Sequence, residues 1–143
     1  MKVYLASKMR GLPSFGAEEF RKAARVLRER GFQVLSPLEM DEDAGIRVDG
    51  LTGFEDLADQ GFDIRQTLML DLGVVLMAVD AVVLLPGWRD SLGAIAEYAT
   101  AQAAGVATWE LTYEDEGIAL TRINTPLVLA SREGAIIELM EEV

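Results

Sequence analysis

Residues 84–97 read Leu-Leu-Pro-Gly-Trp-Arg-Asp-Ser-Leu-Gly-Ala-Ile-Ala-Glu, and this stretch decides the fold. The preceding run from Asp80 to Leu85 is nearly all apolar and stops at Pro-Gly, which predicts a central parallel strand buried on both faces. Ser91 is a good N-cap, so a helix beginning there points free backbone N–H groups at the end of that strand. Ligands of open α/β sheets bind at this edge, and the stretch therefore predicts both a fold and the place of its site.

The other elements follow from hydrophobic spacing and from turn residues. Apolar residues at three- and four-residue intervals predict helices, and short apolar runs predict strands. The expected strands are 2–6, 32–35, 80–85, 106–109 and 126–129, and the expected helices are 14–30 with Ser14 as N-cap, 64–78, 91–105 and one beginning at Ser131. Residues 113–124 give no clear pattern. We predict a Rossmann-like parallel sheet of flavodoxin-like order 2-1-3-4-5, with helices on both faces.

Composition limits the chemistry that is open to the chain. Its 143 residues fit a single domain over 1–143, and it contains no Cys and no His. Acid, base or nucleophilic work would therefore fall to carboxylates, hydroxyls, Lys, Arg or Tyr, and no Ser-His pair can form. The net charge of −11 argues against binding to a nucleic-acid polymer. No apolar run is long enough to cross a membrane and no signal segment is recognisable, so we expect a cytoplasmic protein.

Residues 37–63 form an acidic excursion between the second strand and the next helix. Arg47 is its single cation, whereas acidic residues recur throughout it. Spaced apolar residues, among them Phe54 and Phe62, favour a partly ordered, lid-like segment whose aromatic rings could stack on a ligand. The alternative is a solvated acidic loop.

Polar groups converge at the carboxyl edge of the predicted sheet. In the order 2-1-3-4-5 the first and third strands are neighbours, so the loop 7–11 and the loop 88–93 lie side by side. The side chains of Asp71 and Glu97 are expected close by. Lys8 and Arg10 supply cationic donors, the backbone N–H groups of 91–93 can hold a phosphate or a carboxylate, and Gly93 permits close approach. The arrangement predicts an anion pocket beside an acidic pair.

Each candidate also has an ordinary structural interpretation. Glu97 follows Ala94-Ile95-Ala96 on a helix of small and apolar residues, where a buried carboxylate needs a partner or a function, but it can equally be a solvated helical Glu. Asp71 can lie on the wet face of its helix. Spacing alone leaves both interpretations open.

The same holds for the remaining polar and aromatic candidates. Ser91 can be an N-cap and nothing more, and Tyr4 can be a core tyrosine whose hydroxyl bonds a carbonyl. Arg10 can pair with a surface carboxylate, and Trp88 can cover the strand end.

Several motifs taken together resemble the nucleoside 2-deoxyribosyltransferase-like superfamily. The matching residues run from Val3 to about Gly105 and comprise Val3-Tyr4-Leu5-Ala6, Met9-Arg10-Gly11, Asp71-Leu72, Asp80-Ala81-Val82-Val83, and Ser91-Leu92-Gly93 with Glu97 four residues on. The chain is most similar to the branch that hydrolyses the N-glycosidic bond of nucleoside 5′-monophosphates, and to uncharacterised phage and bacterial relatives with the same Leu-Pro-Gly-Trp strand end.

The resemblance implies a role for each matching residue. Glu97 would be the nucleophile that attacks the anomeric carbon, because a carboxylate stabilises the positive charge of an oxocarbenium-like transition state. Tyr4 would orient Glu97, and Asp71 would bind the sugar or help to protonate the leaving base. Ser91 and the loop Met9-Arg10-Gly11 would hold the 5′-phosphate. Gly93 and Trp88 are counted with these substrate-binding residues.

Two departures from the family pattern refine the expectation. Ala6-Ser7-Lys8 stands where relatives tend to have Gly followed by Pro or Ser, which adds Lys8 as a phosphate contact. Ser91 stands where the free-nucleoside transferases tend to carry an acid, and an acid there would repel a phosphate. We therefore expect an N-glycosidase acting on a (2′-deoxy)nucleoside 5′-monophosphate.

Partners and rival functions complete the sequence-based expectations. The resemblance implies a homodimer, a small-molecule nucleotide as ligand, and no metal or organic cofactor. The alternatives are base exchange between deoxyribonucleosides, as in a nucleoside 2-deoxyribosyltransferase, and a non-catalytic nucleotide-binding or sensing domain on the same fold.

Overall fold

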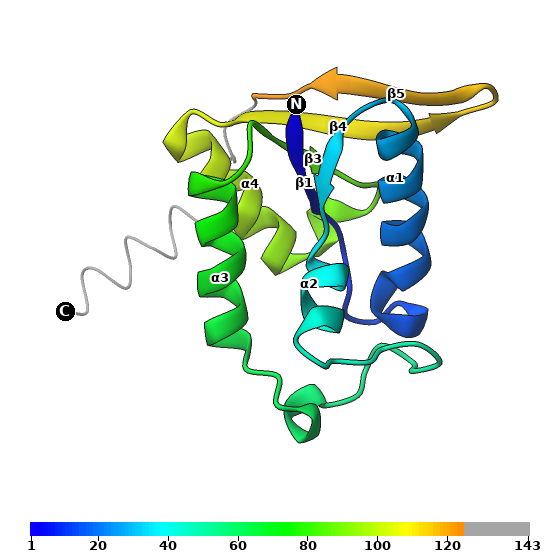
Figure 1. The fold of residues 1–143 in the computed structure, drawn as a ribbon, viewed down its shortest axis with the longest axis vertical. Coiled ribbons are helices and arrows are strands. Elements are labelled where there is room, and N and C mark those ends of the chain that lie inside the picture. The colour runs from blue at the N-terminus through cyan, green and yellow to red at the C-terminus, as the bar shows by residue number, and fades with distance from the viewer. Residues whose placement is uncertain (125–143) are drawn as a thin grey trace, which may run out of the picture.

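The computed structural model describes residues 1–124 and contains one five-stranded sheet (Figure 1). Its strands are β1 (Lys2–Ala6), β2 (Gln33–Leu35), β3 (Ala81–Leu84), β4 (Ala107–Glu114) and β5 (Gly117–Arg122). Their spatial order is β2-β1-β3-β4-β5, which confirms the predicted α/β fold and strand order.

The fifth strand differs from the prediction in its residues and direction. β1 to β4 pair in parallel, but β5 returns antiparallel to β4 in a hairpin, with Glu114 opposite Gly117. β5 and the end of β4 lie within residues 113–124, for which no element is predicted. The strand predicted at 126–129 and the helix predicted from Ser131 lie outside the described residues.

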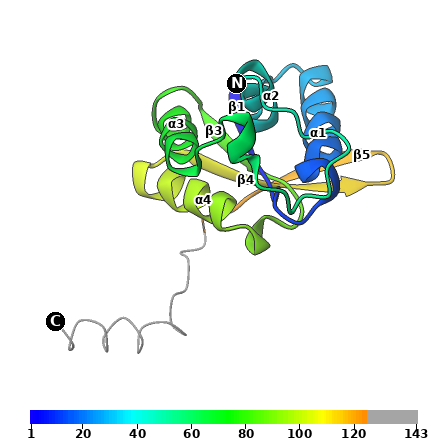
Figure 2. The same cartoon turned by 90° about the horizontal axis from the view of Figure 1, so that it is seen from below.

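Helices cover both faces of the sheet. α1 (Ala17–Glu29) packs on one face, and α3 (Ile64–Met77) and α4 (Leu92–Ala104) lie next to each other on the other (Figure 2). The short α2 (Pro37–Asp43) follows β2, and single turns of 3-10 helix occur at Pro13–Gly16, Leu57–Gln60 and Trp88–Asp90.

The alternation of side chains along β1 decides which residues face which helices. Val3 and Leu5 belong to the core beneath α1, whereas Tyr4 and Ala6 belong to the core beneath α3 and α4. Period-two alternation in a strand requires this division. Tyr4 is thereby placed on the face that also carries Asp71 and Glu97.

Local signals set the ends of the helices. The Ser91 hydroxyl accepts a hydrogen bond from the Ala94 N–H at 3.2 Å, which makes it the predicted N-cap of α4, and Gly105 ends that helix at φ 73°. Ser14 is not the N-cap of α1. It lies in the preceding turn at φ 51°, where its hydroxyl accepts from the Gly50 N–H at 2.9 Å.

The acidic excursion 37–63 is attached to the loop that follows β1. The Gly11 N–H donates to the Gly53 carbonyl at 2.9 Å, and the Arg10 guanidinium donates to the carbonyls of Phe54 and Glu55, each at 2.7 Å. The contact is so close that a Cβ on Gly53 would lie 2.1 Å from the Leu12 carbonyl oxygen. The excursion is therefore an ordered wall beside the carboxyl edge of the sheet.

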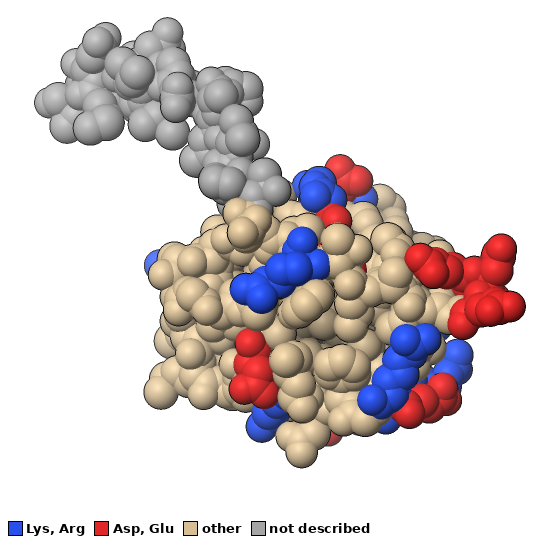
Figure 3. All heavy atoms as spheres, turned by 90° about the horizontal axis from the view of Figure 1, so that it is seen from above, with Lys and Arg blue, Asp and Glu red and all other residues tan. Residues whose placement is uncertain are grey.

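Two surfaces stand apart from the core. α3 exposes Met69, Leu70, Leu76 and Met77, so Leu76 does not belong to the buried stripe around Val75. Figure 3, which looks onto the side of the molecule where the β4–β5 hairpin lies, shows an acidic group at the end that carries the β4–β5 turn. Within residues 1–124, no helix combines the length and the apolar character that crossing a membrane requires.

Candidate functional site

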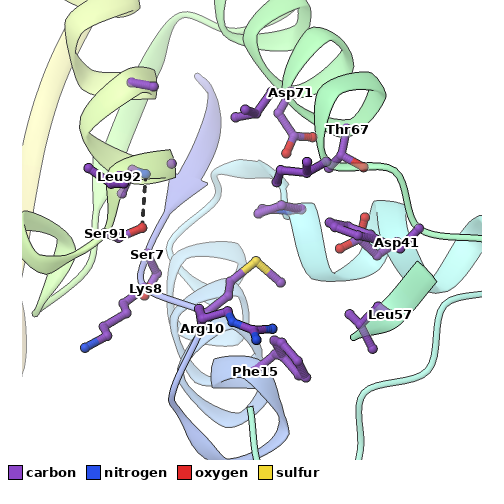
Figure 4. A pocket seen from close by; sticks show the side chains of 18 of the residues that line it. Ser7, Lys8, Arg10, Phe15, Asp41, Leu57, Thr67, Asp71, Ser91 and Leu92 are labelled. Carbon is purple, nitrogen blue, oxygen red and sulfur yellow. Dashed lines mark hydrogen bonds between the residues drawn. The ribbon is translucent and has the colours of Figure 1, made fainter. Parts of the chain in front are cut away.

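A cavity of about 1190 Å³ opens at the carboxyl ends of β1 and β3. Eight of the ten residues proposed from the sequence line it, namely Tyr4, Lys8, Met9, Arg10, Asp71, Ser91, Gly93 and Glu97. Figure 4 shows Lys8 and Ser91 on one side of this space and Asp41 and Thr67 on the other. The structure therefore brings these eight residues to one cavity, and the two sides of that cavity differ in chemistry.

The first side, called the donor side below, consists of Lys8, Ser91 and the start of α4. The N–H groups of Leu92 and Gly93 make no hydrogen bond with any residue in the described part of the chain, as is usual for the first turn of a helix. The Lys8 ammonium likewise has no acidic partner among residues 1–124. Free donors and a positive helix end together can hold an anion.

The most buried polar groups of the lining are Tyr4 and Glu97. Tyr4 is 0% exposed and Glu97 is 6% exposed, and neither the Tyr4 hydroxyl nor Glu97 Oε2 has a hydrogen-bond partner within residues 1–124. Enclosing polar atoms without partners costs about 1–3 kcal/mol for each neutral group. Two such groups side by side at the floor of a cavity indicate that a ligand completes their bonding.

Burial also shifts the acidity of these groups. Burial raises the pKa of Glu97 to about 8, and the nearby Asp71 charge adds to this, while the Tyr4 hydroxyl partly opposes it. The pKa of Tyr4 itself lies well above its usual value because of burial and then the Glu97 charge. The Tyr4 hydroxyl lies close enough to Asp71 and Glu97 to lower the pKa of each, although it makes no hydrogen bond of ordinary geometry with either. At neutral pH, Glu97 is therefore largely protonated in the empty site.

The opposite side, called the carboxylate side, carries Asp71 on α3 and Asp41 on α2. Burial raises the pKa of Asp71 to about 6, and burial together with the Asp71 charge raises that of Asp41 to about 6. Neither side chain makes a hydrogen bond of ordinary geometry with a described residue. Within residues 1–124, no cluster of acidic side chains is arranged to hold a metal ion.

Sequence reasoning missed Asp41 as a site residue. Its signal lay in Ser36-Pro37, because a Ser followed by Pro directly after a strand is typical of a helix start. Such a helix begins at the carboxyl edge of the sheet, and positions 37 and 41 share one face of it. In the acidic excursion, Asp41 looked like one charge among many.

Comparison with known proteins gives a family. Residues 1–109 match the family described as "Domain of unknown function (DUF4406)", which is more than half of the chain. The chain belongs to this family. No curated protein matches it. The part shared with the DUF4406 domains runs from β1 into β4 and includes every residue named on the two sides of the cavity.

Three sequence-proposed contacts lie elsewhere in this DUF4406 domain. Trp88 does not line the cavity: it is buried against Tyr98, with ring centroids 5.0 Å apart, and its indole N–H donates to Glu110 Oε1 at 2.9 Å. Gly11 also lies outside the lining, since it pairs with the excursion. Phe62 lines the cavity and Phe54 does not.

Arg10 lines the cavity, but its guanidinium is engaged with the carbonyls of Phe54 and Glu55. The sequence-based alternative for Arg10 is a surface carboxylate as partner, but the partners in the structure are these two backbone carbonyls. Arg10 connects the loop after β1 to the wall opposite.

Proposed function

We propose that the protein is an N-glycosidase that hydrolyses the bond between base and sugar of a (2′-deoxy)nucleoside 5′-monophosphate. One observation carries the proposal: a buried, unpartnered glutamate, Glu97, lies in a cavity between free anion donors and a second carboxylate. A nucleoside monophosphate has a phosphate at one end and a base at the other, with the reacting carbon between them. The order of phosphate, reacting carbon and base in the nucleotide matches the order of anion donors, Glu97 and second carboxylate in the cavity.

The phosphate is assigned to the donor side. Lys8 supplies a charge, and the Ser91 hydroxyl keeps its own proton free to donate because its oxygen accepts from Ala94. The N–H groups of Leu92 and Gly93, two lining residues, have no partner among residues 1–124. These donors place the sugar next to the floor of the cavity. Arg10 supports the proposal only as a residue that shapes the wall.

The reaction then has two balanced steps. The ionised Glu97 attacks the anomeric carbon while the bond from that carbon to the base nitrogen breaks, and the electron pair leaves with the base, which takes a proton from Asp71. Water next attacks the same carbon, the bond to Glu97 breaks, and Asp71 recovers a proton from that water. The products are free base and (2′-deoxy)ribose 5-phosphate.

Tyr4 acts as a positioning residue in this scheme. Its hydroxyl opposes the rise in the pKa of Glu97, which favours the ionised form that must attack. The reacting state carries one proton on the pair of carboxylates, on Asp71 and not on Glu97. Because the two pKa values are about 6 and about 8, base release should follow a bell-shaped pH profile with its maximum between about pH 6 and 8.

The test is incubation of the purified chain with a panel of ribo- and deoxyribonucleoside 5′-monophosphates, with free base measured by chromatography. We expect base and sugar phosphate in equal amounts. Binding without any base release would overturn the proposal in favour of a sensing domain, which needs the cavity but not the chemistry.

A second free base in the reaction separates hydrolysis from exchange. A transferase would make a new nucleotide, whereas the hydrolase makes none. A slow 2′-fluoro substrate with mass spectrometry should place the trapped sugar on Glu97, and an adduct on Asp71 would reverse the two roles.

The proposal includes a homodimer and a cytoplasmic location. Met69, Leu70, Gly73, Leu76 and Met77 share one side of α3 by helical spacing, and this stripe contains no charge in a chain of net charge −11. A charge-free apolar stripe is where two like-charged copies can meet. We expect sedimentation to give a dimer and Met77→Glu, at a side chain that is 90% exposed, to give a monomer. A monomeric parent chain would contradict the proposal.

A further inference from the structure

The end of the cavity farthest from Lys8 is formed by α2, the 3-10 turn after it and the start of α3. Figure 4 shows Asp41, Leu57 and Thr67 together there, across the space from Lys8 and Ser91. Phe62 also belongs to the lining. Flat apolar walls with a few polar groups suit a planar heterocycle better than a sugar or a phosphate.

Most acidic side chains at this end already accept hydrogen bonds from backbone N–H groups. Asp63 accepts from the N–H groups of Arg65 and Gln66, Asp56 accepts from that of Ala58, and Glu55 accepts from those of Thr52, Gly53 and Phe54. Hydrogen bonds from the Thr52 N–H, the Thr52 hydroxyl and the Gly53 N–H lower the pKa of Glu55 to about 2. Asp41 alone among the four acidic lining residues of the excursion has no such bond with a described residue.

Three carboxylates line the cavity, and they come from three helices. Glu97 lies on α4 with the donor side, whereas Asp71 on α3 and Asp41 on α2 lie across the space from Lys8 and Ser91 (Figure 4). With the phosphate at Lys8 and the anomeric carbon at Glu97, the next part of the substrate, the base, lies at Asp41.

We propose that Asp41 contacts the base and selects amino-bearing bases over bases that present a carbonyl at the same position. This inference rests on the proposed function, since it assigns the base within that site. A carboxylate only accepts hydrogen bonds, so it favours an exocyclic amino group and is repelled by a carbonyl oxygen. The unpartnered Tyr4 hydroxyl and Glu97 Oε2 in the same lining independently indicate that a ligand fills this cavity.

The test compares two ligands that differ along one edge of the ring. Deoxycytidine 5′-monophosphate carries an amino group at C4 and an unprotonated N3, where deoxyuridine 5′-monophosphate carries a carbonyl at C4 and an N–H at N3. Binding of both is measured by calorimetry in the Glu97→Gln chain, so that neither is consumed. We expect at least about a tenfold preference for the cytosine nucleotide.

Asp41→Asn in the same background keeps the shape but adds a donor, so the preference should fall about tenfold, toward equality or reversal. Asp43→Asn is the matched control, because Asp43 is exposed on the same helix and lies outside the lining. It should leave the preference unchanged. Thermal unfolding of each variant checks the fold. The preference of the Glu97→Gln chain is measured without any substitution at Asp41, so it tests the proposal even if Asp41→Asn fails to fold.

Each outcome decides the matter. Equal binding of the two nucleotides, an unchanged preference in Asp41→Asn, or an equal change in Asp43→Asn overturns the role of Asp41. If the preference depends on Asp41 but the parent chain, which keeps Glu97, releases no base, the role of Asp41 is supported and the proposed hydrolysis is overturned. Failure of both nucleotides to bind overturns both.

Discussion

The donor side and the carboxylate side of the cavity differ in what keeps their polar groups free. On the donor side, the free N–H groups of Leu92 and Gly93 follow from the start of any helix, and Lys8 carries its charge at the end of a long, partly exposed side chain. On the carboxylate side, Asp41 and Asp71 are held half-buried and without ordinary hydrogen bonds, next to the buried Glu97. The first arrangement costs the fold little, whereas the second is unfavourable in the empty protein.

This difference indicates which side of the cavity a ligand or a reaction uses most directly. An arrangement that destabilises the empty protein persists when a ligand or a reaction uses it. The carboxylate side should therefore dominate turnover, and the donor side should dominate affinity for the phosphate. Substitutions on each side can separate the two effects.

The largest effect is expected at Glu97. Glu97→Gln removes the nucleophile but keeps the shape, so base release should fall by about 10³-fold or more while nucleotide binding changes only a few-fold. Single-turnover assays and calorimetry measure the two quantities. Glu116→Gln, in the turn before β5, is the control. A variant that retains a tenth of the activity would show that Glu97 is not the nucleophile.

The same substitution should change how stability depends on pH. The folded pKa of Glu97, about 8, lies above the ordinary value of 4.5, so its protonated form favours the folded state. That stabilisation is complete below pH 4.5 and is lost as the pH rises through 8. Between pH 5 and 8, the parent chain should lose on the order of 3 kcal/mol relative to Glu97→Gln. Urea unfolding of both chains tests this, and parallel pH profiles would contradict it.

On the donor side, Lys8→Met should weaken binding of 5′-monophosphates about 10- to 100-fold and leave the corresponding free nucleosides unaffected. The reason is that only the phosphate meets the Lys8 charge. Calorimetry with a nucleotide and its nucleoside measures the contrast. Lys22→Met is the control, because Lys22 on α1 lies over the ring of Tyr113 on β4 and outside the lining of the cavity. Equal losses for nucleotide and nucleoside would place the phosphate elsewhere.

The parts of this site that the sequence predicts are those governed by neighbours along the chain. The apolar run, Pro86-Gly87 and Ser91 are sufficient for β3, its turn and the start of α4, since each signal acts within a few residues. Tyr4 also follows from local alternation, once the strand order is known.

The parts that the sequence does not predict depend on distant contacts. Arg10 bonds carbonyls 44 and 45 residues away, and Trp88 bonds Glu110, 22 residues away. No local pattern encodes such pairings. Asp41 is a similar case, because only the packing of α2 beside the cavity distinguishes it from the solvated acids around it.

The smallest effect is expected at Gly93, where stability and binding should move in opposite directions. A Cβ there would meet only Ser91 Oγ, at 3.9 Å, so Gly93→Ala fits the fold. It should stabilise the protein by about 0.4–1 kcal/mol, and raise Tm by about 1–4 °C, because alanine reduces the entropy of the unfolded chain.

The added methyl group would nevertheless stand beside the free N–H groups of the donor side and weaken phosphate binding several-fold. The matched control is the free nucleoside, because it lacks the phosphate that the donor side is proposed to hold. It should bind Gly93→Ala and the parent chain equally well. If Gly93→Ala binds the nucleotide as tightly as the parent chain, the start of α4 does not hold the phosphate, and the donor side reduces to Lys8.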